Sequence, residues 1–390
     1  MSIVDHLRDG PAYLDYNATT PVDPEVVEAM LPYLTTHFGN PSSSHAYGRS
    51  AATAVAAARA QVAALIGAAP EEIVFTSTGS EANALALQGA MLPALRTGRN
   101  HLITQITEHP SVLETCEALK RRHGIWVTYL AVDEHGSVDP EALRRSVNER
   151  TALVSLQFAN GETGTIHPIP QLADIAHEAG ALFHTDAAQA MGKIPVDVGL
   201  LGVDLLTLVG HKFYAPKGIA ALRIRKPLHL EPVISGGGQE RAQRAGTENV
   251  AALVGLGAAA AKAARLLSTE PRRLAGLRDL LQRTLEAAFP GRTQVNGHPS
   301  ERLPNTLNIS VSGIVAADVL SATSEVAAST ASACHSGTHR PSDVLLAMGH
   351  STERALAAFR LSLGRWTGEG DVDRAARALT AQIRKGPDTA

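Results

Sequence analysis

The fold is decided by the stretch Asp204-Leu205-Leu206-Thr207-Leu208-Val209-Gly210-His211-Lys212. Its apolar part has the pattern of a strand that is buried on both faces, as strands are in a parallel sheet covered by helices. Lys212 therefore follows the carboxyl end of a buried strand, which is the edge where open α/β sheets bind their ligands. We interpret Lys212 as a site residue and not as a solvated surface lysine.

A second polar motif, Asp186-Ala187-Ala188-Gln189, follows another expected strand in the same half of the chain. A lysine and an aspartate at strand ends are what an enzyme that uses pyridoxal 5'-phosphate (PLP) needs. The amine forms a Schiff base, and the carboxylate holds the protonated pyridine nitrogen. Together the two motifs predict a PLP enzyme with Lys212 and Asp186 at its centre.

Short β-like runs alternate with helical runs along the chain, which predicts an α/β fold built on a mainly parallel sheet. The Ala-rich segment 51–66 is a strong helix, and Gly67 ends it. Further strands are expected at 73–76, 102–105, 127–130, 152–158, 181–185 and 219–223.

The turn after the first of these strands is a candidate phosphate site. Ser77-Thr78-Gly79-Ser80 separates strand 73–76 from a helix that begins near Glu81. The backbone N–H groups of Gly79 and Ser80 would then point into the mouth of the sheet at a helix N-terminus, where phosphate binds readily.

Composition limits the class of protein. With 390 residues, 44% of them hydrophobic, and a net charge of −3, the chain can bury a full core and is expected to form two domains. The near-neutral balance offers no basic patch for nucleic acid, and no apolar run approaches the roughly 20 residues that cross a bilayer. We therefore expect neither nucleic acid nor a membrane as a partner.

The amino end and the cysteines bear on localisation. The start, Met1–His6, has neither a cationic region nor an apolar core, so it lacks the pattern of a secretory signal. Cys116 and Cys334 are too few for a disulfide framework, which fits a reducing compartment. These features predict a cytoplasmic protein.

A polar connection that contains Pro and Arg, at 268–273, is expected to lead into a second domain with strands at 306–311 and 359–363. We expect residues 15–265 to form a large PLP-binding domain. Residues 1–14 and 266–390 would form a smaller α+β domain that carries the loop of Cys334.

A set of motifs in fixed order gives the chain a family resemblance. The motifs are Asp15-Tyr16-Asn17-Ala18-Thr19-Thr20-Pro21, Gly39-Asn40-Pro41-Ser42-Ser43, Glu108-His109, Asp186-Ala187-Ala188-Gln189, Gly210-His211-Lys212, Gly236-Gly237-Gly238-Gln239-Glu240-Arg241, Ala245-Gly246-Thr247-Glu248-Asn249 and Ala333-Cys334-His335-Ser336. From about Tyr13 to Arg365, the chain resembles the cysteine desulfurase and selenocysteine lyase family. The resemblance implies a homodimeric PLP enzyme of the class V aminotransferase fold (fold type I, with a seven-stranded sheet). Such an enzyme removes sulfur or selenium from cysteine or selenocysteine and leaves alanine.

The resemblance also implies roles for individual residues around the cofactor. Lys212 would be the Schiff-base lysine, Asp186 the partner of the pyridine nitrogen, and Gln189 a contact of the phenolic oxygen of the ring. His109 would stack on the ring and take part in proton transfer. The phosphate would be held by Gly79, Ser80 and His211, together with Thr247 of the partner subunit. The substrate would be held by Arg360 and Asn40. An arginine suits the substrate carboxylate because its two-pronged contact cannot be reproduced by lysine.

Cys334 is the candidate nucleophile. It lies among the small and polar residues of segment 329–338, which favours an exposed loop. An unperturbed thiol has a pKa of about 8.5, so a small thiolate fraction is present at neutral pH and is strongly nucleophilic. A persulfide formed on Cys334 would pass its sulfur to an acceptor protein or a small molecule.

Cys116, in contrast, is expected to be a buried structural thiol. It shares one helical face with Val112, Leu113 and Leu119. No metal site is expected around Cys334, because no second cysteine lies near it.

Two departures from the family pattern leave the substrate open. Gly161 stands where the family usually has an asparagine that touches the phenolic oxygen, and Val209 stands where many relatives have a phosphate-binding serine. Valine is tolerated there in the selenocysteine lyase branch. A cysteine desulfurase is the leading hypothesis, and a selenocysteine lyase is the second.

Two further alternatives remain. One is another PLP-dependent carbon–sulfur lyase or aminotransferase of a biosynthetic pathway. The other is a scaffold or sulfur-carrier partner that kept the fold while losing part of the cofactor site, as Gly161 could suggest. The presence of Lys212, Asp186 and Cys334 together argues against the scaffold.

Overall fold

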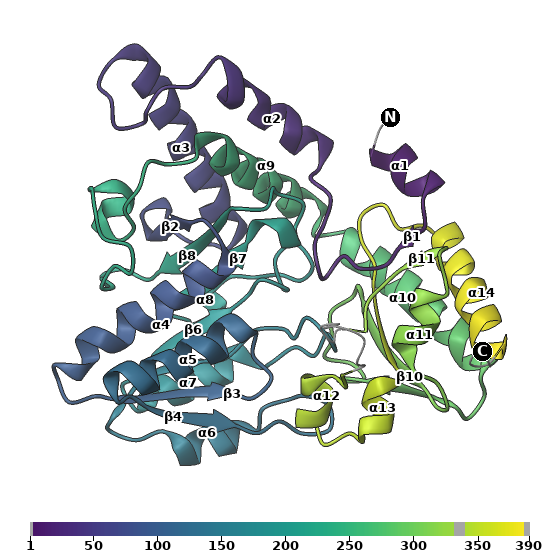
Figure 1. The fold of residues 1–390 in the computed structure, drawn as a ribbon. Coiled ribbons are helices and arrows are strands. Elements are labelled where there is room, and N and C mark those ends of the chain that lie inside the picture. Colours follow the sequence, from purple (N-terminus) through teal and green to yellow (C-terminus); the bar gives the residue numbers. More distant parts are fainter. Residues whose placement is uncertain (1–2, 331–339, 386–390) are drawn as a thin grey trace.

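The computed structural model describes residues 3–330 and 340–385. A large sheet with helices on both sides occupies one part of the molecule, and a smaller sheet with its own helices occupies the other (Figure 1). The N-terminal segment runs from the smaller part into the larger one and so connects both.

The large sheet has seven strands in the order β2-β8-β7-β6-β5-β3-β4. Only β8 runs antiparallel to its neighbours, and the pairs from β7 to β4 are all parallel. The strands are β2 (Ile73–Thr76), β3 (His101–Gln105), β4 (Trp126–Leu130), β5 (Thr151–Ser155), β6 (Leu182–Asp186), β7 (Leu205–Val209) and β8 (Ala220–Ile224). The predicted mainly parallel, seven-stranded α/β architecture is confirmed.

Helices bury both faces of this sheet. Along β7, Leu206 and Leu208 join one hydrophobic core, while Leu205 joins the core on the opposite face, because successive strand side chains alternate in direction. This explains why the strand is apolar at nearly every position. The helices of this part are α2 (Pro24–Thr35), α3 (Ala46–Leu65), η1 (Pro70–Glu72), α4 (Gly79–Leu95), α5 (Pro110–His123), α6 (Pro140–Ser146), α7 (Ile169–Glu178), α8 (Val198–Leu201), η2 (Gly210–Lys212), η3 (Gln239–Ala242) and α9 (Val250–Leu266).

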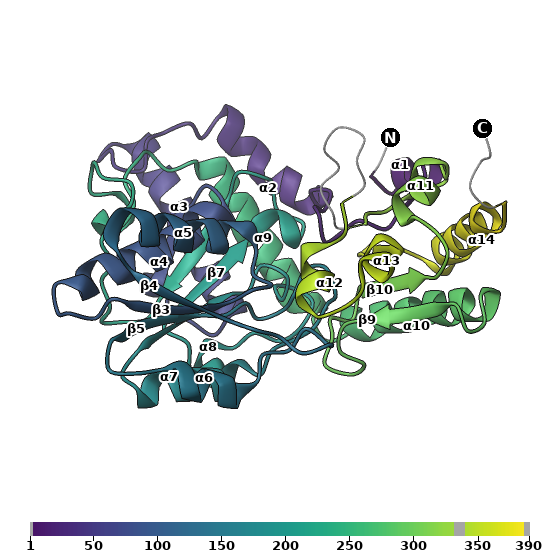
Figure 2. The same ribbon diagram turned by 60° about the horizontal axis from the view of Figure 1, so that its bottom comes forward.

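The smaller part is built on a three-stranded antiparallel sheet in the order β12-β10-β9. A short parallel pair, β1 with β11, joins the N-terminal segment to it. Helices α10 and α14 lie side by side against this part (Figure 2). Its elements are α1 (Ile3–Asp9), β1 (Ala12–Tyr13), α10 (Glu270–Ala288), β9 (Thr293–Asn296), β10 (Thr306–Val311), α11 (Ala316–Ser321), β11 (Val326–Ala327), α12 (Asp343–Ala347), α13 (Thr352–Leu356), β12 (Ala358–Ser362) and α14 (Glu369–Lys385).

A separate hydrophobic core fills the smaller part. It combines Ala12 and Leu14 from the amino end with the inner faces of α10, β10, β12 and α14. This separation supports the proposed division into a large domain of residues 15–265 and a small domain of residues 1–14 with 266–390.

The expected elements agree with the structure except at three places. The helix expected at 51–66 begins already at Ala46 and ends at Leu65. The strand expected at 152–158 ends at Ser155. The expected connection at 268–273 is wrong beyond residue 269, because α10 begins at Glu270 and has a proline in its first turn. A proline at that position loses no helical hydrogen bond, so it starts the helix instead of interrupting it.

No single helix in residues 3–330 and 340–385 has both the length and the apolar character to cross a membrane. The pair α9 and α10 passes that test only when taken together across a bend of 75°.

Candidate active site

Lys212 lies at the turn between β7 and β8, directly after the strand that predicted it. The turn needs Gly210, because a Cβ there would come within 2.9 Å of Ile219 Cγ2 and 3.0 Å of Ile219 O. Lys212 Nζ donates to the backbone oxygens of Asn17 and Ala18, each at 2.8 Å. Burial, together with the positive charge of Arg360, lowers the pKa of Lys212 to about 8. The amine is therefore largely neutral, and nucleophilic, at mildly alkaline pH.

Asp186 ends the neighbouring strand β6 and is buried. Its Oδ2 accepts a hydrogen bond from Asn83 Nδ2 at 2.8 Å, and its Oδ1 accepts one from Ala188 N at 2.9 Å. Asn83 Nδ2 also donates to Ser111 Oγ at 2.9 Å. Two neutral donors thus hold the carboxylate, and no described residue forms a salt bridge with it.

A second carboxyl group, Glu108, lies close enough to Asp186 for the two charges to interact. Burial and the Asp186 charge raise the pKa of Glu108 well above its usual value. Glu108 Oε1 accepts from Gln157 N at 2.6 Å, and Oε2 is buried without a partner in the described part of the chain. Burial and the neighbouring carboxylate thus favour the neutral form of Glu108.

His109 follows Glu108 and is the N-cap of α5. Its Nδ1 accepts a hydrogen bond from Ser111 N at 3.1 Å, which leaves the proton of a neutral ring on Nε2. Desolvation lowers the pKa of the imidazole, although the Asp186 charge opposes the shift. The ring is thus a neutral donor at its Nε2 edge.

The phosphate cup predicted at Gly79 and Ser80 is the first turn of α4. Thr78 caps the helix by accepting a bond from Glu81 N at 3.1 Å, and the N–H groups of Gly79 and Ser80 point out of the first turn without a helical acceptor. A Cβ at position 79 would lie 2.4 Å from Val209 Cγ2. The valine at 209 therefore makes glycine necessary at 79.

His211 borders the same region. Its Nδ1 lies 3.1 Å from Thr19 Oγ1. Burial, followed by the charge of Lys212, lowers the pKa of His211 to about 4. The ring is neutral at physiological pH.

Gln189 extends from the segment after β6 toward the N-terminal segment. Its Nε2 donates to Asn17 O at 3.0 Å, and its Oε1 accepts from Lys193 Nζ at 2.7 Å. A Cβ at Gly161 would lie 2.8 Å from Gln189 Nε2. The space beside Gly161 is thus taken by the Gln189 amide, so an asparagine at 161 fits only if Gln189 moves.

Arg360 lies on β12 and pairs with Asp15 across the junction of the two parts, with Nη2 to Oδ1 at 2.6 Å. Its Nε is buried without a partner among the described residues. The backbone N of Arg360 donates to Ser329 O at 2.7 Å. The guanidinium therefore has an unused donor, and the chain just before residue 331 is fixed beside it.

The structure brings most of the predicted residues together. The charges of Lys212, Asp186, Arg360, His109 and His211 lie near enough to affect one another's pKa values. Two predicted residues lie apart from this group: Asn40 and Thr247 are exposed, and among the described residues no hydrogen bond or ion pair links either of them to it. Cys334 lies outside the described residues.

The interpretation of Cys116 as a structural thiol is confirmed. The side chain is fully buried in α5, and burial raises the pKa of its thiol far above the usual value. It is therefore inert as a nucleophile.

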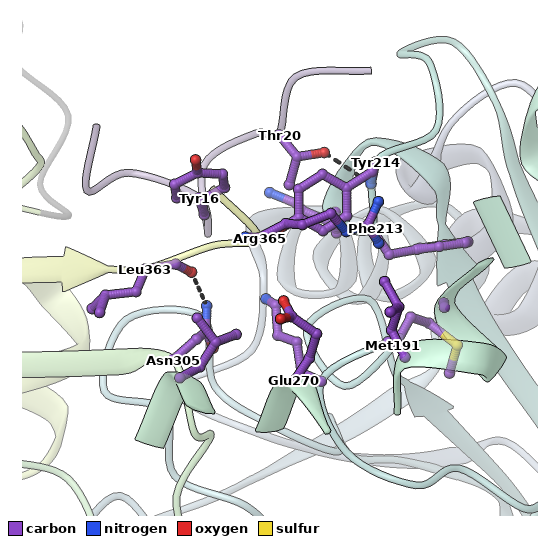
Figure 3. A pocket seen from close by; sticks show the side chains of 15 residues that line it. Tyr16, Thr20, Met191, Phe213, Tyr214, Glu270, Asn305, Leu363 and Arg365 are labelled. Carbon is purple, nitrogen blue, oxygen red and sulfur yellow. Dashed lines mark hydrogen bonds between the residues drawn. The ribbon is translucent and has the colours of Figure 1, made fainter. Parts of the chain in front are cut away.

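A small cavity lies at the junction of the two parts. Figure 3 shows Tyr16, Tyr214 and Arg365 gathered on one side of it, with Glu270 and Asn305 nearby. Lys212 and Lys193 also line this cavity, whereas Asp186, His109 and Gln189 do not. Lys212 is therefore the one of these four predicted site residues that lines the cavity.

Three residues at or beside the site, Asn17, Glu162 and Lys193, have no role assigned to them by the sequence. Asn17 lies inside the motif Asp15–Pro21, Glu162 directly follows Gly161, and Lys193 lies four positions after Gln189. Glu162 accepts a short hydrogen bond from Ser342 Oγ, and burial raises its pKa to about 7. The four-residue spacing of Gln189 and Lys193 could have indicated from the sequence that these two side chains are neighbours. The role of Asn17, in contrast, depends on contacts between distant segments.

Comparison with known proteins places this geometry in a family. The family model of class-V aminotransferases matches residues 12–375. A protein named cysteine desulfurase from Trichormus azollae is 46% identical over 375 residues, which cover 96% of this chain and 93% of that protein. A solved structure titled NifS-like protein superimposes with a TM-score of 0.89 at 34% identity, covering 96% of this chain and 100% of the other. A second solved structure, titled SspA in complex with cysteine, has a TM-score of 0.79 at 35% identity and covers 90% of this chain and 98% of the other. This chain belongs to the class-V aminotransferase family.

Proposed function

We propose that this protein is a PLP-dependent cysteine desulfurase, which converts L-cysteine to L-alanine and transfers the sulfur to an acceptor. The observation that carries the proposal is the half-buried Lys212 amine, with its lowered pKa, in the same site as the buried carboxylate of Asp186. The similarity to proteins named cysteine desulfurase over 96% of the chain supports it. The presence of both Lys212 and Asp186 in one site weighs against a scaffold that has lost the site.

The described residues fit PLP by the chemistry of their donors. Lys212 offers a neutral amine to the aldehyde, and Asp186 offers a carboxylate to the ring nitrogen. The first-turn N–H groups at Gly79 and Ser80 suit the phosphate, and Gln189 Nε2 has one N–H without a partner among the described residues. When bound, PLP supplies an electron sink for the substrate carbon.

Lys212 is proposed to move the proton of the substrate α-carbon. Positioned general bases of this kind contribute about 10²- to 10⁴-fold in rate. The oxygens of Asn17 and Ala18 hold the amine when it is not attached to the cofactor. His109 is proposed to donate from Nε2 toward the same space, from its position at the N-cap of α5.

Sulfur transfer is assigned to Cys334 from the sequence. Its thiolate would attack the sulfur of bound cysteine, so that a sulfur–sulfur bond forms and the carbon–sulfur bond breaks. The electron pair of the broken bond stays with the carbon, which takes up a proton and leaves as alanine. Enzyme persulfide is the product, and an acceptor protein or small molecule removes its outer sulfur.

Arg360 is proposed to bind the substrate carboxylate, because its buried Nε has no partner in the described chain and its Nη2 is oriented by Asp15. Arg360→Lys loses the two-pronged contact, so we expect the KM for cysteine to rise by about tenfold or more, with a smaller change in kcat. Steady-state kinetics measure both. Arg377→Lys, an exposed arginine paired with Asp373, is the matched control and should leave KM unchanged. If Arg360→Lys has the wild-type KM, Arg360 does not bind the substrate carboxylate.

The active form is proposed to be a homodimer. The outer face of α2, the loop after it and the first turn of α3 expose large apolar side chains, including Leu34 at 64%, Phe38 at 72% and Tyr47 at 61%. Exposed apolar groups of this extent mark protein–protein contacts. Asn40 lies in the same loop as Phe38, which supports a role in the site of the partner subunit, as proposed for Thr247.

Leu34→Glu is expected to weaken this dimer, because a charge would be buried in the contact. Sedimentation equilibrium should give a monomer at concentrations where the wild type is dimeric, and PLP retention should fall. Leu200→Glu changes an equally exposed leucine on α8 and should stay dimeric. A dimeric Leu34→Glu protein would place the contact elsewhere.

A steady-state comparison of cysteine with selenocysteine tests the proposed function. Alanine and sulfide or selenide are measured together, with and without a thiol acceptor. Formation of alanine from cysteine supports the desulfurase. If only selenocysteine is turned over, the protein is a selenocysteine lyase, and if neither yields alanine, another PLP reaction replaces both.

A further inference from the structure

Lys193 is a buried lysine without a carboxylate partner. It is 8% exposed, and it follows Gln189 by one helical turn of sequence. Its Nζ donates to Gln189 Oε1 at 2.7 Å and to Asn17 Oδ1 at 3.0 Å. None of its hydrogen bonds within the described chain is to a carboxylate. A buried amine costs free energy to desolvate, so its position calls for a reason other than stability.

The contacts of Lys193 decide how the Gln189 amide is turned. A lysine amine placed between two oxygens donates to both, whether it carries three hydrogens or two. Oε1 of Gln189 must therefore face Lys193, and Nε2 must face the opposite way. On that side Nε2 gives one N–H to Asn17 O at 3.0 Å, and its second N–H has no partner in the described residues.

Asn17 is fixed by the same logic. Its Oδ1 accepts from Lys193 and from Asn305 Nδ2 at 3.0 Å, while its Nδ2 donates to Thr306 Oγ1 at 2.8 Å and to Gly161 O at 3.1 Å. Asn17 O accepts from Gln189 and from Lys212 Nζ. The two amides and two lysines thus form one continuous network around the proposed attachment point of the cofactor.

We propose that Lys193 is a positioning residue that holds Gln189 with Nε2 turned toward the phenolic oxygen of the cofactor ring. The inference rests on the proposed function, because it requires PLP in this site. Gly161 makes the arrangement important in this chain: no side chain at 161 can donate to that oxygen, and the Gln189 amide fills the space beside it. Lys193 acts through Gln189 and does not touch the reacting atoms.

The test is a pH titration of the visible absorbance of the PLP-loaded protein. A donor to the phenolic oxygen stabilises its anion and so lowers the pH at which the bound chromophore loses its proton. In Lys193→Met the Gln189 amide is free to turn, and we expect the transition to rise by about one pH unit. The Kd for PLP added to the apoprotein should rise by about tenfold. Lys226→Met, which removes an exposed lysine paired with Glu71, should match the wild type in both measurements.

Three further variants separate positioning from a structural role. Lys193→Arg keeps the donors and should restore most of the wild-type transition. Gln189→Leu should raise the transition by itself, and adding Lys193→Met to it should cause no further shift, because the two residues act as one unit. Gln189→Glu keeps a partner for Lys193 but removes the donor, so it should titrate like Lys193→Met even if the latter fails to fold.

The outcomes distinguish this inference from the proposed function. If the wild type shows no visible band with PLP and no alanine from cysteine, the proposed function fails. If the wild type passes both tests but Lys193→Met or Gln189→Glu titrates like it, the positioning role is wrong. An additional shift from Lys193→Met in the Gln189→Leu background would also overturn it, because Lys193 would then act by another route.

Discussion

Lys212→Ala is expected to lose turnover of cysteine by about 10³-fold or more, because the same amine attaches the cofactor and moves the α-proton. The protein should still fold, since the Lys212 side chain lies at a turn and its partners are two backbone oxygens. Alanine formation gives the rate. Borohydride reduction followed by peptide mapping shows where the cofactor was attached.

Two other lysines serve as controls for this experiment. Lys217 is exposed on the same turn, and Lys217→Ala should keep wild-type attachment and turnover. Lys193 shares Asn17 as a hydrogen-bond partner with Lys212, so it is a second amine that could attach the cofactor when Lys212 is replaced. A Lys212→Ala protein that still turns over cysteine, or wild-type cofactor mapped to Lys193, would show that the attachment point was assigned to the wrong lysine.

Cys334→Ser is expected to abolish persulfide formation and the release of alanine from cysteine, while the bound cofactor keeps its wild-type spectrum. A thiol is a poor leaving group from carbon until another sulfur attacks it, and serine oxygen cannot do so. Some selenocysteine breakdown should remain, because selenide leaves more readily. Mass spectrometry after a single turnover locates the persulfide.

Cys116→Ala is the matched control for the thiol. Cys116 is fully buried and its thiol has a strongly raised pKa, so its removal should leave persulfide formation intact. Persulfide found on Cys116, or alanine released at the wild-type rate by Cys334→Ser, would show that a group other than Cys334 accepts the sulfur.

The large sheet and the centre of the site could be predicted from the sequence, because both depend on local residue patterns. A buried strand followed by Gly210-His211-Lys212 places the lysine at the edge of the sheet, and Asp186 is placed in the same way. The composition of segment 268–273 is typical of a connection, but the order of its residues favours a helix start. Thr269-Glu270-Pro271 is a helix-start pattern, and α10 begins there.

The contacts between distant segments could not be predicted in this way. The pairing of Asp15 with Arg360 joins residues 345 positions apart, and no periodicity indicates it. The Lys193 amine is similar: its polarity suggests the surface, and only the approach of Asn17 from the N-terminal segment makes a buried position tolerable. Burial of polar groups depends on their partners, which a single sequence does not reveal.

The network at Asn17 has a consequence for the order in which the protein matures. Asn17 N donates to Ser362 Oγ, which lies 345 residues later in the chain, and the side-chain amide of Asn17 forms hydrogen bonds with Asn305 and Thr306. Contacts this far apart in sequence form late in folding, because the long intervening chain must first be organised. The large sheet can therefore form on the nascent chain, while the seat of Lys212 is completed only after β12 has been synthesised.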